Sequence, residues 1–428
     1  MAGAEVQSSG IRGGTAPHMA QHELVYATPE RTEDFFAAVV HGFHDDYVAE
    51  QWEPMREVFE PERSFGFQVD GRWISTCGAY SRILTVPGGS VPVAAVTVVT
   101  VQPSYRRRGL LTEMMKHQLH DIQQRGNEPI ALLWASEAAI YGRYGYGQAS
   151  PRLHLSGNTK TTAFRPDVDL GSGSVGEVER DQAIPVIKQL HQRLLPDRVG
   201  ALNRDDNWWV VKWHDPERWR HGRSAYRFAL HYERRGRPDG YVAFRVKMNW
   251  EGSNPGAEVI IDELDAVDAQ ARAALWRFVL DLDLVRSFRV DGAPVDEPLR
   301  YLVSDLRSVK AELQDGTYAR LVDVPRALEA RRYLSELDVI IGVDDLLLTR
   351  NVGSVRLQAD LDGASATRSR RKPDLIMNVR ELSAIYLGGT PLAALVRAGL
   401  VTERTKGAAL ATAAAFGWPQ PPFCADFF

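Results

Sequence analysis

Cysteine is scarce in this chain, which has Cys77 and Cys424 and no others among its 428 residues. The two lie far apart and match no zinc-binding or redox spacing. A disulfide scaffold is therefore excluded, and a reducing cytoplasm is the expected location, with export that needs no signal peptide left open. We expect no metal site.

Positive charge and long apolar runs are also lacking. The formal net charge is -4, so no excess of positive charge calls for nucleic acid or an anionic membrane as partner. The most apolar stretch, residues 91–101, is interrupted by Pro92, Thr97 and Thr100 and is typical of a β-strand. No stretch reaches the ~20 apolar residues of a membrane-spanning helix, so we expect no membrane span.

The first 18 residues lack the apolar core of a signal peptide. They mix Gly, Ser and Gln and end in Pro17-His18 before Met19. We interpret residues 1–18 as a leader or tag that lies outside the fold.

The rest of the chain alternates helical and strand patterns, which indicates an α/β protein with mixed sheets. Hydrophobic residues at 44% and charged ones at 25% are ordinary for a globular protein, and 428 residues suggest two to three domains. In the first part we expect helices over 32–43 and 110–124, and strands over 64–69, 73–84, 91–101 and 130–134. Farther on we expect a helix over 268–282 and strands over 226–233, 239–246, 339–343, 346–349 and 374–379.

A Gly- and Arg-containing loop follows the strand 91–101 and opens a helix. The start of a helix presents unpaired N–H donors and the positive end of its dipole, which suits a pyrophosphate. Gly109 lets the backbone approach the anion, and Arg106, Arg107 and Arg108 can add charge-assisted hydrogen bonds. The loop is neither a Walker loop nor a Rossmann fingerprint. An exposed Arg-rich turn remains the alternative.

Two motifs carry a specific resemblance. Arg106-x-x-Gly109-x-Leu111 is similar to the pyrophosphate motif of GNAT acetyltransferases, with Leu111 in place of a small residue. Arg106-Arg107-Arg108-Gly109-Leu110-Leu111, followed by Ala135-Ser136-Glu137-Ala138-Ala139-Ile140-Tyr141-Gly142, resembles the Eis (enhanced intracellular survival) family. The resemblance continues in Asp315-Gly316, Val324-Pro325, residues 327–331 and Tyr386-Leu387-Gly388, and so covers nearly the whole chain.

This resemblance implies an acetyl-CoA-dependent N-acetyltransferase that modifies amines of aminoglycosides or other polyamines by direct attack in a ternary complex. It implies a catalytic GNAT domain over 19–160, a second GNAT-like domain without cofactor over 161–304, and a sterol-carrier-protein-like domain over 305–428. It also implies a homohexamer. The expected cofactor contacts are the backbone groups of Val99 and Val101 and the loop residues Arg106, Arg107, Arg108, Gly109, Leu110 and Leu111.

Direct attack needs a group that returns a proton to the departing thiolate and a group that takes one from the substrate ammonium. A phenol with a pKa of ~10 can protonate a thiolate of pKa ~8.5 at modest cost, and the resemblance places the acid at Tyr141. For the base, His44, Asp45, Glu137 and the C-terminal carboxylate are all candidates. Glu137 follows Ser136, the expected cap of a short helix, where a carboxylate is also favoured by the dipole.

The chain ends Phe423-Cys424-Ala425-Asp426-Phe427-Phe428 after a proline-rich run, whereas free termini are commonly polar and frayed. In the Eis family the terminal carboxylate acts as base, which implies this role for Phe428. Asp426 stands where the family pattern has an apolar residue. By the same resemblance Asp45 and Arg56 line the acceptor pocket, and Met55 stands where some relatives have tryptophan. We expect Glu137 to be a third substrate-binding residue.

Two other functions compete with this interpretation. A GNAT site alone does not separate a small polycationic acceptor from the Nε amine of a protein lysine. A lipid- or sterol-binding protein is the third hypothesis, since the C-terminal part resembles sterol carriers. The loop 106–111 and Tyr141 argue against it, because a lipid carrier needs neither.

Overall fold

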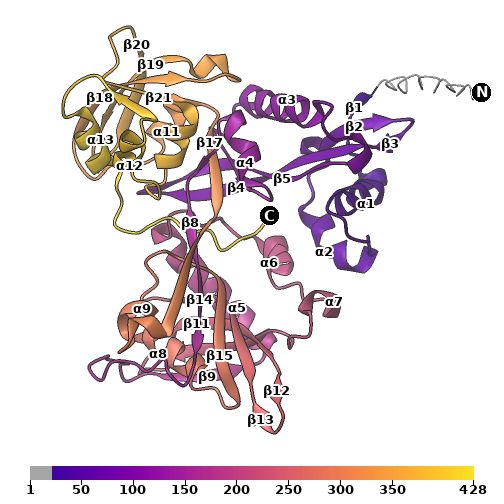
Figure 1. The fold of residues 1–428 in the computed structure, drawn as a ribbon, viewed down its shortest axis with the longest axis vertical. Coiled ribbons are helices and arrows are strands. Elements are labelled where there is room, and N and C mark those ends of the chain that lie inside the picture. Colours follow the sequence, from indigo (N-terminus) through magenta and orange to yellow (C-terminus); the bar gives the residue numbers. More distant parts are fainter. Residues whose placement is uncertain (1–21) are drawn as a thin grey trace, which may run out of the picture.

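The computed structural model describes residues 22–428, which form three mixed α/β parts around a central C-terminus (Figure 1). The predicted leader, residues 1–18, lies outside the described residues. Within them, the predicted mixed α/β fold class is confirmed. None of the helices formed by these residues is both long and apolar enough to cross a membrane.

The first sheet has the strand order β1-β2-β4-β5-β6-β17-β7, with β3 paired to β2. Its strands are β1 (Glu23–Tyr26), β2 (Phe65–Val69), β3 (Arg72–Trp73), β4 (Ser75–Val86), β5 (Gly89–Val101), β6 (Ile130–Trp134), β7 (Gly147–Gln148) and β17 (Thr317–Leu321). Its helices are α1 (Thr32–Gly42), α2 (Ala49–Val58), α3 (Leu110–Arg125) and α4 (Ala138–Tyr141). Helix α3 buries Met114, Met115 and Leu119 because their spacing places them on one helical face.

The second sheet has the order β16-β8-β15-β14-β11-β10-β9. Its strands are β8 (Pro151–Asn158), β9 (Ser174–Val178), β10 (Arg227–Tyr232), β11 (Pro238–Lys247), β14 (Ala257–Ala266), β15 (Val285–Ala293) and β16 (Val309–Asp315), and β12 (Trp250–Glu251) with β13 (Asn254–Pro255) makes a separate hairpin. Its helices are α5 (Arg180–Leu194), α6 (Asp206–Lys212), α7 (Glu217–Arg220), α8 (Ala269–Leu280) and α9 (Leu299–Leu302).

The third sheet has the order β20-β19-β18-β21-β22. Its strands are β18 (Leu337–Asp344), β19 (Gly353–Ala359), β20 (Ala364–Ser369), β21 (Leu375–Asn378) and β22 (Val401–Glu403). The helices of this part are α10 (Val324–Glu329), α11 (Val379–Ile385), α12 (Leu392–Arg397) and α13 (Ala408–Phe416).

The strands cross between the parts. Strand β8 lies before residue 160, the expected end of the first domain, but pairs with β15 and β16 of the second sheet. Strand β17 lies after residue 304, the expected end of the second domain, but pairs with β6 and β7 of the first sheet. The domain limits 160 and 304 stay predictions. These two strands therefore link the first sheet to the second.

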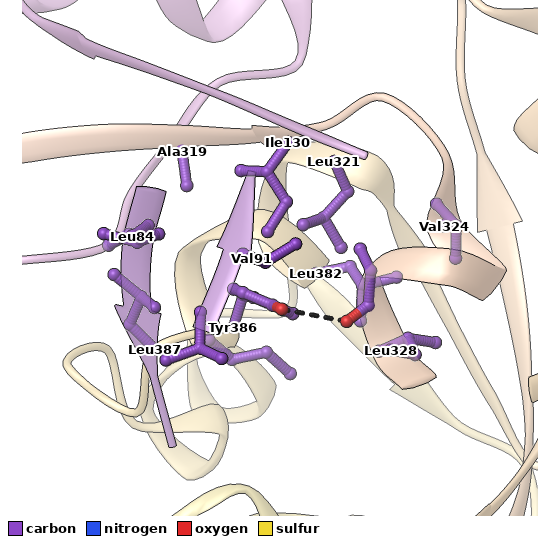
Figure 2. Close-up of a cluster of buried hydrophobic side chains, with 14 of the residues drawn as sticks. Leu84, Val91, Ile130, Ala319, Leu321, Val324, Leu328, Leu382, Tyr386 and Leu387 are labelled. Atoms are coloured by element: carbon purple, nitrogen blue, oxygen red, sulfur yellow. Dashed lines mark hydrogen bonds between the residues drawn. The ribbon is translucent and has the colours of Figure 1, made fainter. Parts of the chain in front are cut away.

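Apolar packing joins the first sheet to the third part. Figure 2 shows Leu84 and Val91 of the first sheet beside Leu382, Tyr386 and Leu387 of the third part, all fully buried or nearly so. The Tyr386 hydroxyl donates a 2.9 Å hydrogen bond to the Ala327 carbonyl. Cys424 and Phe428 of the C-terminal tail belong to the same buried cluster.

Two predicted details are wrong. Residues 346–349 form no strand, because the Asp345 carboxylate accepts hydrogen bonds from the N–H groups of Leu347 and Leu348 and turns the chain. The short helix α4 is preceded by Glu137 as its N-cap rather than by Ser136, and no side chain caps it.

Candidate active site

Strands β5 and β6 separate at one end, and this opens a groove in the first sheet. They pair in parallel from Val93 opposite Ile130 to Val96 opposite Leu133, after which β5 continues alone to Val101. A bulge opposite Thr76 and Gly78 gives Val98 a φ of 48° and bends β5. The edge of β5 that faces β6 is thus available to an extended ligand over the last residues of the strand.

The loop between β5 and α3 presents a row of free backbone donors. Among the described residues, the N–H groups from Arg107 to Thr112 donate to no backbone or side-chain acceptor. Gly109 has a φ of 87°, and a Cβ built there would meet no atom within 4 Å. This concave, positively polarised turn at the start of a 16-residue helix fits a pyrophosphate.

Two of the arginine side chains of the loop bind to nearby backbone carbonyls. Arg106 donates from Nε to the Val101 carbonyl at 3.1 Å, and Arg108 donates to the Ser104 carbonyl at 2.9 Å. Leu110 is buried in the core, and Leu111 is partly buried. The side chains of these two leucines therefore pack inward, and only their backbone N–H groups are available to a ligand at the loop.

A cavity of about 760 Å³ adjoins this groove and is lined by all three parts of the chain. Of the predicted site residues, it brings together Asp45, Val99, Tyr141 and Phe428. Val101, Arg56, Glu137 and the loop residues 106–111 are not among its lining residues. The cavity therefore unites the proposed acid and base, and the pyrophosphate loop lies outside it.

Tyr141 ends helix α4 and is only 5% exposed, with its ring edge-on to Tyr146 at 6.0 Å between centroids. Burial, together with the nearby Cys77, Tyr144 and Glu137, raises the pKa of Tyr141 well above the usual value for a phenol. The hydroxyl therefore keeps its proton at neutral pH.

The C-terminal tail runs between the first and second parts (Figure 1). The Phe423 N–H donates to the Val199 carbonyl at 2.8 Å, and the Ser150 hydroxyl donates to the Pro422 carbonyl at 3.0 Å. Phe428 is only 8% exposed, whereas the Phe427 ring is largely exposed. The terminal residue is thus held at the cavity and does not fray.

The predicted acceptor residues have different surroundings. Asp45 lies at the cavity and forms a 3.0 Å ion pair with Arg218 of the second part. Arg56 instead pairs with Glu33 at 2.5 Å, so its guanidinium is engaged away from the cavity, while the neighbouring Met55 lines it. Glu137 is an exposed cap residue.

Much of the cavity wall was missed by sequence analysis, because it comes from the second part. The lining residues found only in the structure include Trp134, Arg152, Trp208, Lys212, Arg223, Arg245, Asp262, Asp291 and Asp315. Isolated charged residues of this kind carry no local signal. Two of the lining residues do have a local signal: Trp134 ends the predicted strand directly before the Ala135-Ser136 motif, and Asp315 belongs to the Asp315-Gly316 pair of the family resemblance.

Three family models match the chain. Residues 23–149 match an acetyltransferase (GNAT) domain, residues 200–321 match a second acetyltransferase (GNAT) domain, and residues 324–425 match a sterol carrier protein domain. The three matches follow the order of the three parts, except that the second match includes β17, which pairs in the first sheet.

Relatives extend the match over most of the chain. An uncharacterised N-acetyltransferase of Streptomyces avermitilis is 41% identical over 88% of this chain and 92% of its own length. The N-acetyltransferase Eis of Mycobacterium tuberculosis is 32% identical over 76% of this chain and 78% of that protein. The crystal structure of Eis1 from Mycobacterium abscessus superposes with a TM-score of 0.80 at 31% identity, covering 95% of this chain and all of Eis1.

A GNAT acetyltransferase of Anabaena variabilis superposes with a TM-score of 0.81 at 20% identity, which supports the fold alone. The open edge of β5, the donor-rich loop and the similarity to Eis proteins over most of the length lead to one assignment. The chain belongs to the Eis family of N-acetyltransferases, with two GNAT domains and a sterol-carrier-like C-terminal domain.

Proposed function

We propose that this enzyme transfers the acetyl group of acetyl-CoA to amines of aminoglycosides or similar polycationic molecules, by direct attack in a ternary complex. The observation that carries the proposal is that Tyr141 and the terminal residue Phe428 line one cavity beside the open edge of β5. Amide formation in one step requires that the general acid and the general base both reach the reacting groups, so the two must lie close together.

The donor fits the groove of the first GNAT domain. Its pyrophosphate would lie on the free N–H groups from Arg107 to Thr112, with Gly109 allowing close approach. The amide-rich pantetheine arm would add along β5 at Val99 and Val101, where β6 no longer pairs. Arg106, Arg107 and Arg108 would add charge around the loop. Acetyl-CoA supplies the activated acyl group.

The residues of the chain then handle two protons. The Phe428 carboxylate takes a proton from the acceptor ammonium, which frees the nitrogen lone pair to attack the thioester carbon. As the C–N bond forms and the C–S bond breaks, the Tyr141 hydroxyl gives its proton to the thiolate. The nitrogen then releases its second proton, which restores the Tyr141 phenol, and the Phe428 carboxyl returns its proton to the solvent. An α-carboxylate of pKa ~3.3–3.7 is a weak base in water, so burial of Phe428 supports this role by destabilising its charged form.

The cavity suits a cationic acceptor of drug size. Binding cavities for such molecules measure about 300–1,000 Å³, and this one is about 760 Å³. Asp315 lies in its wall, accepts a 3.0 Å hydrogen bond from Tyr318, and has no Lys or Arg partner among the ion pairs of residues 22–428. Asp315 and the terminal carboxylate can therefore bind two separate amines of one acceptor.

The Nε amine of a protein lysine would undergo the same chemistry. Enclosure of the cavity by three domains favours a small molecule over a folded protein surface. A sterol or lipid ligand of the C-terminal domain is the remaining alternative. We also propose, from the family resemblance, that the enzyme is a cytoplasmic homohexamer, which sedimentation equilibrium would test for assembly.

The experiment measures release of the CoA thiol from acetyl-CoA with a panel of aminoglycosides, linear polyamines and lysine peptides. We expect the highest kcat/KM with aminoglycosides, and mass spectrometry should show one added acetyl group per thiol released. Turnover with lysine peptides alone would replace the proposed acceptor class. Lipid bound in a 1:1 ratio without thiol release would replace the proposed function.

A further inference from the structure

The residue two positions before the terminus is held by a buried ion network. The Asp426 carboxylate lies 2.7 Å from Arg204 Nε, and the other two guanidinium nitrogens of Arg204 donate to the Glu263 carboxylate at 3.0 and 2.9 Å. The side chains of Arg204, Glu263 and Asp426 are 1%, 8% and 7% exposed. Because all three guanidinium nitrogens of Arg204 bind buried carboxylates, the side chains of Asp426 and Glu263 can move little.

Lys212 adds a second contact to the tail. It ends helix α6, donates to the Ala425 carbonyl at 3.2 Å, and lies 3.0 Å from Glu263. The Tyr241 hydroxyl also donates to Glu263. Arg204, Lys212, Tyr241 and Glu263 all belong to the second GNAT domain, so that domain grips the tail at two consecutive residues.

The charges of the network are maintained at neutral pH. Burial by itself raises the pKa of Glu263, but Arg204 and Lys212 outweigh it and hold that pKa well below its usual range. Burial by itself lowers the pKa of Arg204, but Asp426 and Glu263 outweigh it and raise that pKa. Lys212 also lies 3.3 Å from the Asp262 carboxylate, so two cations face three carboxylates and each charge has an opposite partner in contact.

The first GNAT domain holds the same residue from the other side. Trp134 at the end of β6 donates from its indole nitrogen to the Asp426 carbonyl at 2.8 Å. Asp426 is thus fixed through its backbone by one domain and through its side chain by the other. An apolar residue at this position would leave Arg204 without one of its two carboxylates.

We infer that the Arg204–Asp426 ion pair, supported by Lys212, is a positioning element that aims the terminal carboxylate of Phe428 into the acceptor cavity. The second GNAT domain, which the resemblance describes as lacking a cofactor, thereby contributes to catalysis in the first. This inference rests on the proposed role of Phe428 as base. A displacement of about 1 Å in such a group can reduce the rate about 100-fold.

The test compares Asp426→Asn with Asp265→Asn. Asp265 lies on β14 two residues from Glu263 and pairs with Arg198 at 2.7 Å, but it has no contact with Asp426 or Phe428 among the hydrogen bonds and ion pairs of the described residues. We expect Asp426→Asn to lower kcat about 100-fold with unchanged acetyl-CoA affinity, and Asp265→Asn to keep the wild-type kcat. Asp426→Glu, which keeps the charge, should recover part of the loss.

A second readout reports the position of the tail directly. Carboxypeptidase A removes aromatic C-terminal residues that are accessible, and the buried Phe428 should resist it in the wild type. We expect faster release of phenylalanine from Asp426→Asn than from Asp265→Asn. Equal release rates and wild-type kcat in a folded Asp426→Asn protein would overturn the inference.

Two further variants separate the possible failures. Deletion of Phe427 and Phe428 should abolish transfer. If it does and Asp426→Asn keeps full kcat, the assignment of Phe428 as base is supported and the positioning role of Asp426 is wrong. If the deletion also keeps full kcat, the proposed base itself is wrong. Should Asp426→Asn fail to fold, Lys212→Met decides: a reduced kcat supports the inference and an unchanged kcat overturns it.

Discussion

The indole nitrogen of Trp134 donates a hydrogen bond to the carbonyl of Asp426, a residue 292 positions later in the chain. The Phe427 ring lies on the same indole, with 5.8 Å between ring centroids. The end of β6, where this strand separates from β5, therefore packs against the C-terminal tail. The C-terminal tail and residues of the first GNAT domain thus line one cavity.

Replacement of Gly109 by valine tests the donor site. We expect acetyl-CoA affinity to fall by about 100-fold or more, because a β-branched residue disfavours the φ of 87° and places methyl groups where the pyrophosphate would lie. Isothermal titration calorimetry measures the affinity. Gly126→Val is the matched control, since Gly126 ends the same helix at a φ of 69°. Equal losses of affinity in both variants would contradict the assignment.

Tyr141→Phe removes one hydroxyl and leaves the packing intact. If this hydroxyl protonates the thiolate, kcat should fall by about 10²–10⁴-fold with little change in acetyl-CoA affinity. Tyr146→Phe is the control: its ring contacts Tyr141, but among the described residues its buried hydroxyl has no hydrogen-bond partner. A Tyr141→Phe enzyme as active as Tyr146→Phe would make Tyr141 a packing residue.

The same two tyrosines contribute to the pH dependence of stability. Burial raises the pKa of Tyr141 and of Tyr146 well above the usual value. Above pH ~10 the unfolded chain loses these protons and the folded chain keeps them, so the free energy of unfolding falls by about 1.4 kcal/mol per pH unit for each such group.

Urea unfolding of the wild type and Tyr146→Phe at pH 9, 10 and 11 measures this slope. The variant should lose stability less steeply above pH 10, because it lacks one buried phenol. Identical slopes in the two proteins would show that Tyr146 ionises normally in the folded state.

A buried ion pair ties the first sheet to the third domain. Arg320 on β17 lies 2.7 Å from the Asp345 carboxylate, and both side chains are almost fully buried. Asp345→Asn leaves the guanidinium without its counter-charge and should lower the free energy of unfolding by about 3–5 kcal/mol. Asp338→Asn, which breaks the exposed Arg356–Asp338 pair, should cost less than about 1 kcal/mol. Chemical denaturation compares the two, and similar losses would contradict this view of the junction.

Elements with strong local patterns could be predicted from the sequence. The helix from Leu110 and the strands that end at Val101 and Trp134 were predicted nearly to the residue, because their apolar spacing matches their buried faces. The turn at Asp345 was missed, because it depends on side-chain hydrogen bonds to the backbone of Leu347 and Leu348.

Long-range relationships could not be predicted from local pattern. The pairing of β17 with β6 joins residues far apart in the chain, and nothing near Thr317 marks it. Lys212 and Asp262 reach the cavity only because the second domain packs against the tail. Tyr141 and Phe428 became candidates through family resemblance, and the structure places both at one cavity. The surroundings of Asp426 were found only in the structure.

The central claim is that the terminal carboxylate of Phe428 is the catalytic base. Its most direct test is the kcat of enzyme made by C-terminal ligation with Phe428 either as the free acid or as the α-amide. The amide keeps both phenyl rings and removes only the charge. We predict that the amide loses transfer activity by about 10²–10⁴-fold and binds acetyl-CoA as before. An amide enzyme with the kcat of the free acid would show that the base lies elsewhere.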